Sequence, residues 1–256
     1  MGVQTRLDRL RHHARRPLAR MPYAWDLAMM SRQSKRITLA RKDTAIVIDG
    51  FLRSGNTFSV AAFTIANGRL PMGRHLHGAP HILRAVRMGL PTVVLIRDPA
   101  DAVASYLIRR PSLTPADALL EYLDFYRTAW RARGGFVVAL FDDVVKDFGT
   151  VTRRVNEKFG TSFVPYEPTA ENERAAFELV EEMNRLECRG ELVETHVGRP
   201  SAGRAERKRQ IQQQLGLPRA SRLLAEADAI FARYVEAAAS PAPAERPDPA
   251  TQEDAS

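Results

Sequence analysis

The stretch Thr44-Ala-Ile-Val-Ile-Asp-Gly-Phe-Leu-Arg-Ser-Gly-Asn-Thr57 decides the fold of this 256-residue chain. Residues 44–49 are continuous and rich in β-branched side chains, which is typical of a strand buried on both faces. This strand runs directly into a glycine-containing loop, and a helical pattern follows from Phe58. A strand, a loop and a helix in this order predict one unit of a parallel α/β protein.

Strand and helix patterns alternate beyond this stretch, as far as residue 160. Further strands are predicted at 92–96 and 136–141, with a weaker candidate at 73–77, and helices at 58–67, 80–89, 101–110 and 115–133. After residue 165 the strand signals vanish, and helices are predicted at 171–188 and 223–239, with a polar loop at 194–203. We therefore expect a three-layer α/β fold with a central parallel sheet flanked by helices, and a helical C-terminal part.

The net charge of +8 is the unusual bulk property of the chain. Residues 1–42 hold eleven Lys or Arg against two Asp, residues 43–239 hold 26 basic against 24 acidic residues, and residues 240–256 hold one Arg against four acids. The chain thus divides into a basic N-terminal arm (1–42), an α/β domain (43–239) and a proline-rich tail (240–256) that we expect to be flexible. Because the excess charge belongs to the arm, it does not indicate nucleic acid as a partner. The arm could pack on its own domain as a helix, or it could be a surface for nucleic acid or for a membrane of acidic lipid.

The cysteine content and the apolar runs indicate the cellular compartment. Cys188 is the only cysteine, so an intrachain disulfide is excluded. No apolar run approaches the roughly 20 residues that a membrane span needs. These features predict a cytoplasmic protein.

The loop after the first strand has the spacing of a phosphate-binding loop. Gly50, Gly55 and Thr57 match G-x-x-x-x-G-K-[ST], in which backbone N–H groups and the start of the following helix surround a phosphate. Asn56 occupies the lysine position, and Arg53 inside the loop supplies a positive charge instead. The loop therefore predicts an anion site that differs from that of a nucleoside-triphosphate hydrolase.

A second motif follows the strand at 92–96. Arg97 comes directly after this strand, where open α/β sheets bind ligands, and Ser105 lies eight residues later in the predicted helix. A guanidinium offers paired donors, so Arg97 and Ser105 are candidates to bind a second phosphate.

Together these two motifs resemble those of sulfotransferases that use 3′-phosphoadenosine 5′-phosphosulfate (PAPS). The segment 51–57 looks like the 5′-phosphosulfate loop of that family, and the segment 97–105 looks like its 3′-phosphate element; the resemblance covers roughly residues 44–163. It implies a P-loop-type fold, a PAPS co-substrate without a metal, and transfer of a sulfuryl group to a hydroxyl. The implied donor ligands are Arg53, Ser54, Gly55, Asn56 and Thr57 at the 5′ end and Arg97 and Ser105 at the 3′-phosphate. The family often has lysine at the position of Arg53. Arg53 is expected to stabilise the charge on the bridging oxygen of the phosphosulfate as the S–O bond breaks.

Transfer to a hydroxyl needs a base, and histidine fits this role. His75 and His77 have the spacing that places both on one face of a strand. The family carries a catalytic histidine at the end of such a strand, and so His77, just before the predicted helix start at Gly78, is the first choice. His75 remains the alternative, and both could instead be held by local hydrogen bonds. No third ligand has a spacing that suggests a metal site.

A basic segment near the C-terminus contains Arg199 and Arg204. In the family a basic loop at this stage folds over the 3′-phosphate, so these two arginines are further candidates, or else belong to a solvated helix start. The sequence does not identify the substrate that accepts the sulfuryl group, so sugar, lipid and other small-molecule hydroxyls all remain open. An aromatic stripe at Tyr106, Tyr122, Phe125, Tyr126 and Trp130 is more typical of a core.

Two other functions remain as alternatives. A P-loop kinase or NTPase would use Asp142, after the strand at 136–141, to hold Mg²⁺, although Asp142 could equally cap the next helix. The absent lysine at Asn56 speaks against this function. A non-catalytic protein that binds nucleic acid through its basic arm is the second alternative.

Overall fold

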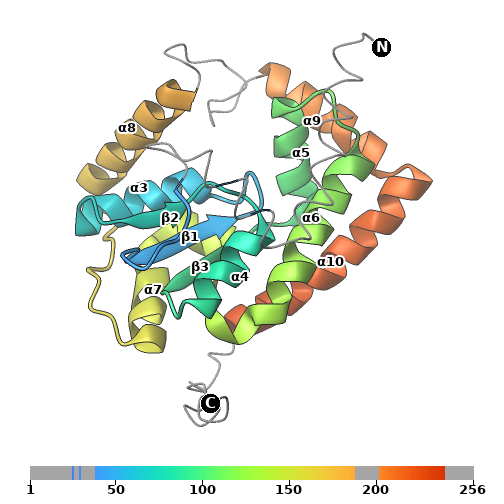
Figure 1. Ribbon diagram of the computed structural model, residues 1–256. Coiled ribbons are helices and arrows are strands. Elements are labelled where there is room, and N and C mark those ends of the chain that lie inside the picture. The colour runs from blue at the N-terminus through green and yellow to red at the C-terminus, as the bar shows by residue number, and fades with distance from the viewer. Residues whose placement is uncertain (1–24, 26–28, 30–37, 188–201, 240–256) are drawn as a thin grey trace, which may run out of the picture.

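Helices cover both faces of one central sheet in the computed structural model, which describes residues 25, 29, 38–187 and 202–239 (Figure 1). The strands are β1 (Ile46–Gly50), β2 (Met72–Arg74), β3 (Thr92–Ile96) and β4 (Val137–Leu140). They pair in parallel in the order β2-β1-β3-β4. The expected α/β fold with a parallel sheet flanked by helices is confirmed at this level.

The helices form two layers. They are α3 (Asn56–Asn67), α4 (Ala79–Arg87), α5 (Pro99–Arg109), α6 (Pro115–Ala129) with the 3₁₀ turn η1 (Trp130–Gly135), α7 (Phe141–Phe159), α8 (Ala170–Glu187), α9 (Ala202–Leu215) and α10 (Pro218–Ala239). Along β3, Val93 and Leu95 pack with α3, α7 and α8, whereas Val94 and Ile96 pack with α4, α5, α6 and α10. Alternate side chains of a strand point to opposite faces, so a continuous apolar run is needed where both faces are covered.

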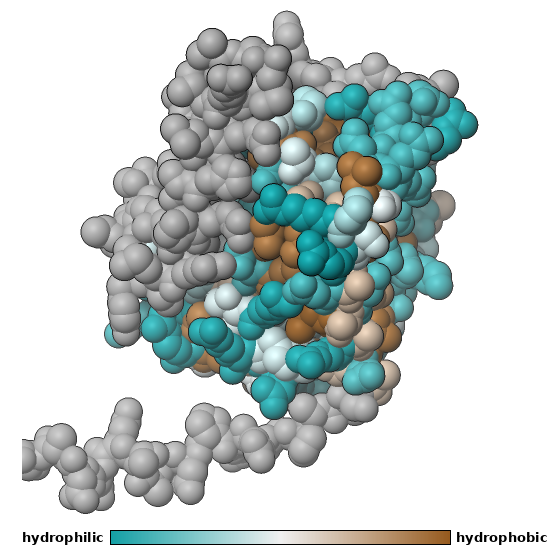
Figure 2. All heavy atoms as spheres, turned by 90° about the vertical axis from the view of Figure 1, so that its right-hand side faces the viewer, coloured by the Kyte–Doolittle hydropathy of each residue, from teal (hydrophilic) through white to brown (hydrophobic). Residues whose placement is uncertain are grey.

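The aromatic stripe of α5 and α6 belongs to the second of these layers. Tyr106, Tyr122, Phe125 and Tyr126 are all buried in it, and Trp130 packs against it. The stripe is therefore core, as its helical spacing predicted. Figure 2 views the side on which Figure 1 places α9 and α10, and there hydrophilic side chains lie between groups of apolar ones. Among the described helices, none combines the length and the apolar character needed to cross a membrane.

The prediction of one strand face for both histidines is wrong. β2 ends at Arg74, and the backbone then turns, with left-handed φ angles of 59° at His75 and 50° at His77. Period-two spacing places residues on one face only while the strand continues, and a left-handed residue ends it. The two histidines therefore lie in a loop between β2 and α4.

The carboxyl ends of the strands gather the predicted motifs at one edge of the sheet. Gly50 pairs with Leu95 and Ile96 with Leu140, so the loops after β1 and β3 and the start of α7 after β4 lie side by side. A Cβ atom at Gly50 would lie 2.3 Å from the carbonyl oxygen of Leu95, which shows how closely β1 and β3 approach where the first loop starts. This is the edge where open parallel sheets bind ligands.

Much of the basic arm lies outside the described residues, as does the whole tail at 240–256. Two described parts of the arm contact the domain. The backbone of Thr38 pairs with that of Arg74, and Trp25 is buried with its ring stacked on His81.

Candidate active site

The loop between β1 and α3 is shaped by two left-handed residues. Arg53 has a φ of 69° and Gly55 a φ of 90°, and Gly55 is the residue before the first turn of α3. Among the described residues, no side chain caps this turn and no acidic residue lies in it. The first N–H groups of a helix have no partner within the helix, and its dipole is positive at this end. The electrostatics at the start of α3 therefore favour an anion.

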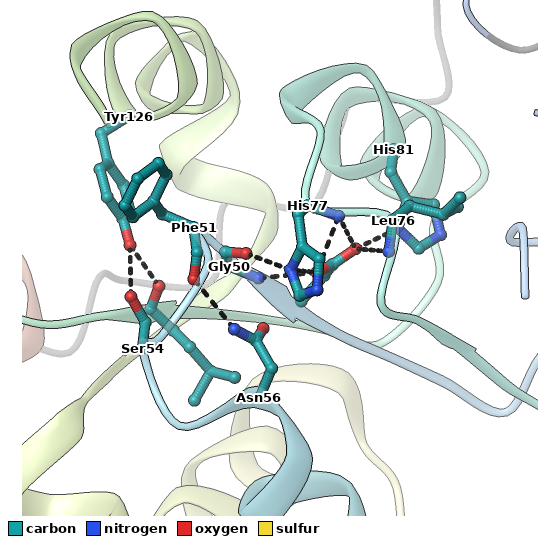
Figure 3. A network of polar contacts seen from close by, with 10 residues as sticks. Gly50, Phe51, Ser54, Asn56, Leu76, His77, His81 and Tyr126 are labelled. Carbon is teal, nitrogen blue, oxygen red and sulfur yellow. Dashed lines mark hydrogen bonds and ion pairs between the residues drawn. The ribbon is translucent and has the colours of Figure 1, made fainter. Parts of the chain in front are cut away.

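Ser54, a predicted donor ligand, points into the protein and anchors the loop. Its hydroxyl is fully buried and lies 3.3 Å from the hydroxyl of Tyr126, which itself donates to the carbonyl of Leu95 at 2.8 Å (Figure 3). Because the Tyr126 proton is used for Leu95, Ser54 is the donor in the first of these bonds. Tyr126 is held in turn by α10, where the hydroxyl of Tyr234 donates to its carbonyl at 2.9 Å.

Asn56, at the position where phosphate loops carry lysine, turns back onto its own loop. Its amide nitrogen donates to the carbonyl of Phe51 at 2.9 Å, and the side chain is buried (Figure 3). Its Oδ1 atom has no hydrogen-bond partner among the described residues. Asn56 thus closes the loop, whereas the following Thr57 is partly exposed.

Arg53 joins the two motifs that the sequence predicts. Its Nε atom donates to the hydroxyl of Ser105 on α5 at 2.9 Å. The guanidinium of Arg97 points to the carbonyl of Arg53 at 3.4 Å. Thus Arg53, Arg97 and Ser105 meet beside the start of α3, although the sequence assigned them to opposite ends of a donor.

Arg97 contacts two residues that the sequence did not assign to the site, Phe141 and Asp101. The ring of Phe141 lies 4.0 Å below its guanidinium carbon, an arrangement that favours a cation. Its Nη2 atom lies 3.6 Å from Asp101, and Lys208 of α9 lies 2.7 Å from the same carboxylate. The hydrogen bond from Lys208 lowers the pKa of Asp101 from its ordinary value, and Arg97 adds to this effect. The sequence indicated the contact between Lys208 and Asp101 only by placing Lys208 in a run of basic residues.

The histidine loop is built around Asp49, the fourth residue of β1. His77 Nδ1 lies 2.9 Å from the carbonyl of Gly50 and 3.3 Å from Asp49 Oδ1. Both neighbours are acceptors, so the hydrogen-bond pattern assigns a proton to Nδ1 of His77 and leaves the lone pair on Nε2. His77 can therefore take a proton at Nε2, and Figure 3 shows its ring beside the start of the loop at Gly50.

The other predicted site residues are placed as follows. The buried ring of His75 lies 5.8 Å from that of His77, centroid to centroid. Arg199 lies outside the described residues, and Arg204 falls in α9 without a described side chain. Asp142 is exposed in the first turn of α7, and no side-chain hydrogen bond caps that helix, so its expected role as a cap is wrong. Within the described ranges, no three His, Cys, Asp or Glu side chains gather closely enough to hold a metal ion.

Comparison with known proteins does not assign the chain to a family. Neither a model of a known protein family nor a curated protein sequence matches the chain.

The Tyr126 anchor gives a prediction for stability. Replacing Tyr126 with phenylalanine removes a donor and an acceptor and leaves the buried Ser54 hydroxyl and the Leu95 carbonyl without this partner. We expect the free energy of unfolding to fall by about 1–3 kcal/mol, measured by urea denaturation. Tyr122→Phe is the matched control, because the Tyr122 hydroxyl makes one bond, to the carbonyl of Arg97, and its loss should cost less. A Tyr126→Phe protein as stable as the parent would contradict this account.

Proposed function

We propose that the chain is a sulfotransferase of P-loop type that transfers a sulfuryl group from PAPS to a hydroxyl. The observation that carries the proposal is the contact between the two anion motifs. Arg53 reaches Ser105, and Arg97 reaches the carbonyl of Arg53, at the uncapped start of α3. A donor with a 5′-phosphosulfate and a 3′-phosphate needs two anion sites this close to one another.

In the proposed reaction the oxygen of the acceptor attacks sulfur in line with the leaving group. A new S–O bond forms, and the bond between sulfur and the bridging oxygen of the phosphosulfate breaks. His77 takes the hydroxyl proton at Nε2, and adenosine 3′,5′-bisphosphate leaves with the bonding electrons. Arg53 and the N–H groups at the start of α3 stabilise the charge that develops on the bridging oxygen.

The rate would come mainly from positioning and from fixed charge. The loop is held by buried contacts through Ser54 and Asn56, so its donors need little rearrangement when the donor binds. Arginine at position 53 keeps its charge at any working pH and cannot itself carry the proton. The proton therefore has to go to a histidine.

Binding of the product nucleotide tests this proposal. Calorimetry with adenosine 3′,5′-bisphosphate should show clearly tighter binding than with 5′-AMP, because only the first ligand carries a 3′-phosphate. Arg97→Ala should weaken bisphosphate binding by about 1.5–3 kcal/mol, roughly the value of a hydrogen bond to a charged group, and leave 5′-AMP binding nearly unchanged. Arg69→Ala, at an exposed arginine after α3, is the control. Equal affinity for both nucleotides would remove the case for a 3′-phosphate site.

Metal dependence separates this proposal from a P-loop kinase or NTPase. A PAPS enzyme should bind its donor in EDTA, whereas a kinase needs Mg²⁺ on its phosphates. Binding of ATP that requires Mg²⁺ and fails with PAPS would favour the kinase instead.

A further inference from the structure

Asp49 is a carboxylate buried without any exposed surface at the end of β1. Its oxygens accept from the backbone N–H groups of Gly50 at 3.0 Å, Leu76 at 3.1 Å and His77 at 3.2 Å. They also lie 2.9 Å from Nδ1 of His81 and 3.3 Å from Nδ1 of His77. A carboxylate is rarely buried unless such partners compensate for the lost water.

These contacts keep Asp49 ionised. Burial alone would raise the pKa of this carboxyl, but the hydrogen bonds and charges of His77 and His81 outweigh burial and hold the pKa well below its usual range. Asp49 is therefore a fixed negative charge directly beside the ring of His77.

His81 binds one oxygen of Asp49, and His77 lies beside the other. The backbone N–H of Ala40 donates to Nε2 of His81 at 3.2 Å, so the proton of His81 lies on Nδ1 and is donated to Oδ2 of Asp49. With both of its nitrogens used in this way, the buried His81 is not placed to accept a proton from a substrate. Oδ1 of Asp49 is the oxygen that faces Nδ1 of His77.

Asp49 also holds the backbone on which His77 stands. The left-handed φ of 50° at His77 is uncommon for a residue other than glycine and has to be held by its surroundings. The bonds from Asp49 to the N–H groups of Leu76 and His77 do this directly. Asp49 thus contacts both the backbone and the ring of His77, and the carbonyl of Gly50 is the second acceptor at the ring.

We infer that Asp49 is the positioning residue of His77: together with the carbonyl of Gly50 it holds the tautomer with the proton on Nδ1, and its charge makes Nε2 a stronger base. The role of His77 as a base in sulfuryl transfer rests on the proposed function, whereas the tautomer and the basicity of its ring do not. Two titratable side chains of the described residues contact this pair: His81 of α4 contacts Asp49, and His75 of the same loop contacts His77.

Nuclear magnetic resonance of the unmodified protein tests the tautomer without any substrate. With ¹⁵N-labelled histidine, we expect both His77 and His81 to carry the proton on Nδ1 in their neutral forms. Assignment uses the His77→Gln and His81→Gln variants, each of which removes one set of signals. A His77 ring protonated on Nε2 would overturn the inference.

Asp49→Asn tests the basicity. Loss of the negative charge should move the titration midpoint of His77 to lower pH by about one unit, because the charge stabilises the imidazolium. Asp43→Asn, at an exposed carboxylate before β1, should leave the midpoint unchanged. A folded Asp49→Asn protein with an unshifted midpoint would contradict the inference.

Activity then separates this inference from the proposed function. If the chain transfers a sulfuryl group, Asp49→Asn should lower kcat by about 10- to 1,000-fold, no more than loss of the base itself, and should shift the acid limb of kcat/KM with the His77 midpoint. In a His77→Gln background the same change should have little further effect on kcat, whereas a merely structural role would lower both backgrounds equally. Absent transfer with the expected midpoint shift would overturn the proposed function and retain the Asp49–His77 pair.

Discussion

His77→Ala is expected to lower the turnover of sulfuryl transfer by about 10²- to 10⁴-fold, the usual contribution of a general base. The affinity for adenosine 3′,5′-bisphosphate should stay nearly unchanged, because His77 lies on the loop after β2. It does not lie on the loop between β1 and α3 (residues 51–55), which we call the anion loop. The reason for the loss is that alanine has no imidazole ring, whose Nδ1 atom contacts Asp49 and the carbonyl of Gly50 and whose Nε2 atom would take the proton. Steady-state kinetics with PAPS and calorimetry with the bisphosphate measure the two quantities separately.

Two further variants make this result decisive. His77→Asn separates backbone strain from loss of the base, since asparagine tolerates a left-handed φ better than alanine does. His75→Ala tests the alternative histidine, whose ring lies in the same loop. A large loss of turnover in His75→Ala with a normal His77→Asn protein would move the base to His75.

Arg53→Ala is expected to lower turnover by about 10²- to 10³-fold, as loss of one donor to a developing negative charge does in other enzymes. Arg53 is the cation of the anion loop and its link to Ser105, so its loss removes charge and positioning together. Ground-state binding of PAPS should weaken less than turnover, because the charge on the bridging oxygen grows as the S–O bond breaks. Single-turnover kinetics with radiolabelled PAPS separate the two effects.

Arg53→Lys is the matched variant for this prediction. Lysine keeps the charge but loses the planar fork of donors, so turnover should recover in part. An Arg53→Ala protein that loses PAPS affinity and turnover to the same extent would show that Arg53 only binds the donor.

The sequence predicts the sheet more completely than the site. Thr92–Ile96 was predicted to the residue, because an apolar run covered by helices on both faces has one simple interpretation. β2 was overextended at its carboxyl end, where a turn at His75 with a left-handed φ leaves no trace in a pattern of side chains. The two predicted phosphate motifs, at 51–57 and 97–105, could be recognised in the sequence because each is a continuous segment that follows one strand end.

The contacts between these segments could not be read from the sequence. Asp49 looks like the polar end of a strand, and its role depends on residues 27 to 32 positions later in the chain. Lys208 contacts Asp101 only because α9 packs along α5. The pairing of Arg53 with Ser105 likewise needs the geometry, since spacing alone pairs Ser105 with Arg97.

The bracing of Ser54 through Tyr126 to Tyr234 has a consequence for how this protein can change over time. Ser54, Tyr126 and Tyr234 lie on three segments spread over most of the domain, yet they form one continuous series of buried polar contacts. A substitution at any of these positions leaves a polar group without its partner at the next. We therefore expect the three positions to covary among homologous sequences, so that substitutions in α10 accompany substitutions in the loop between β1 and α3.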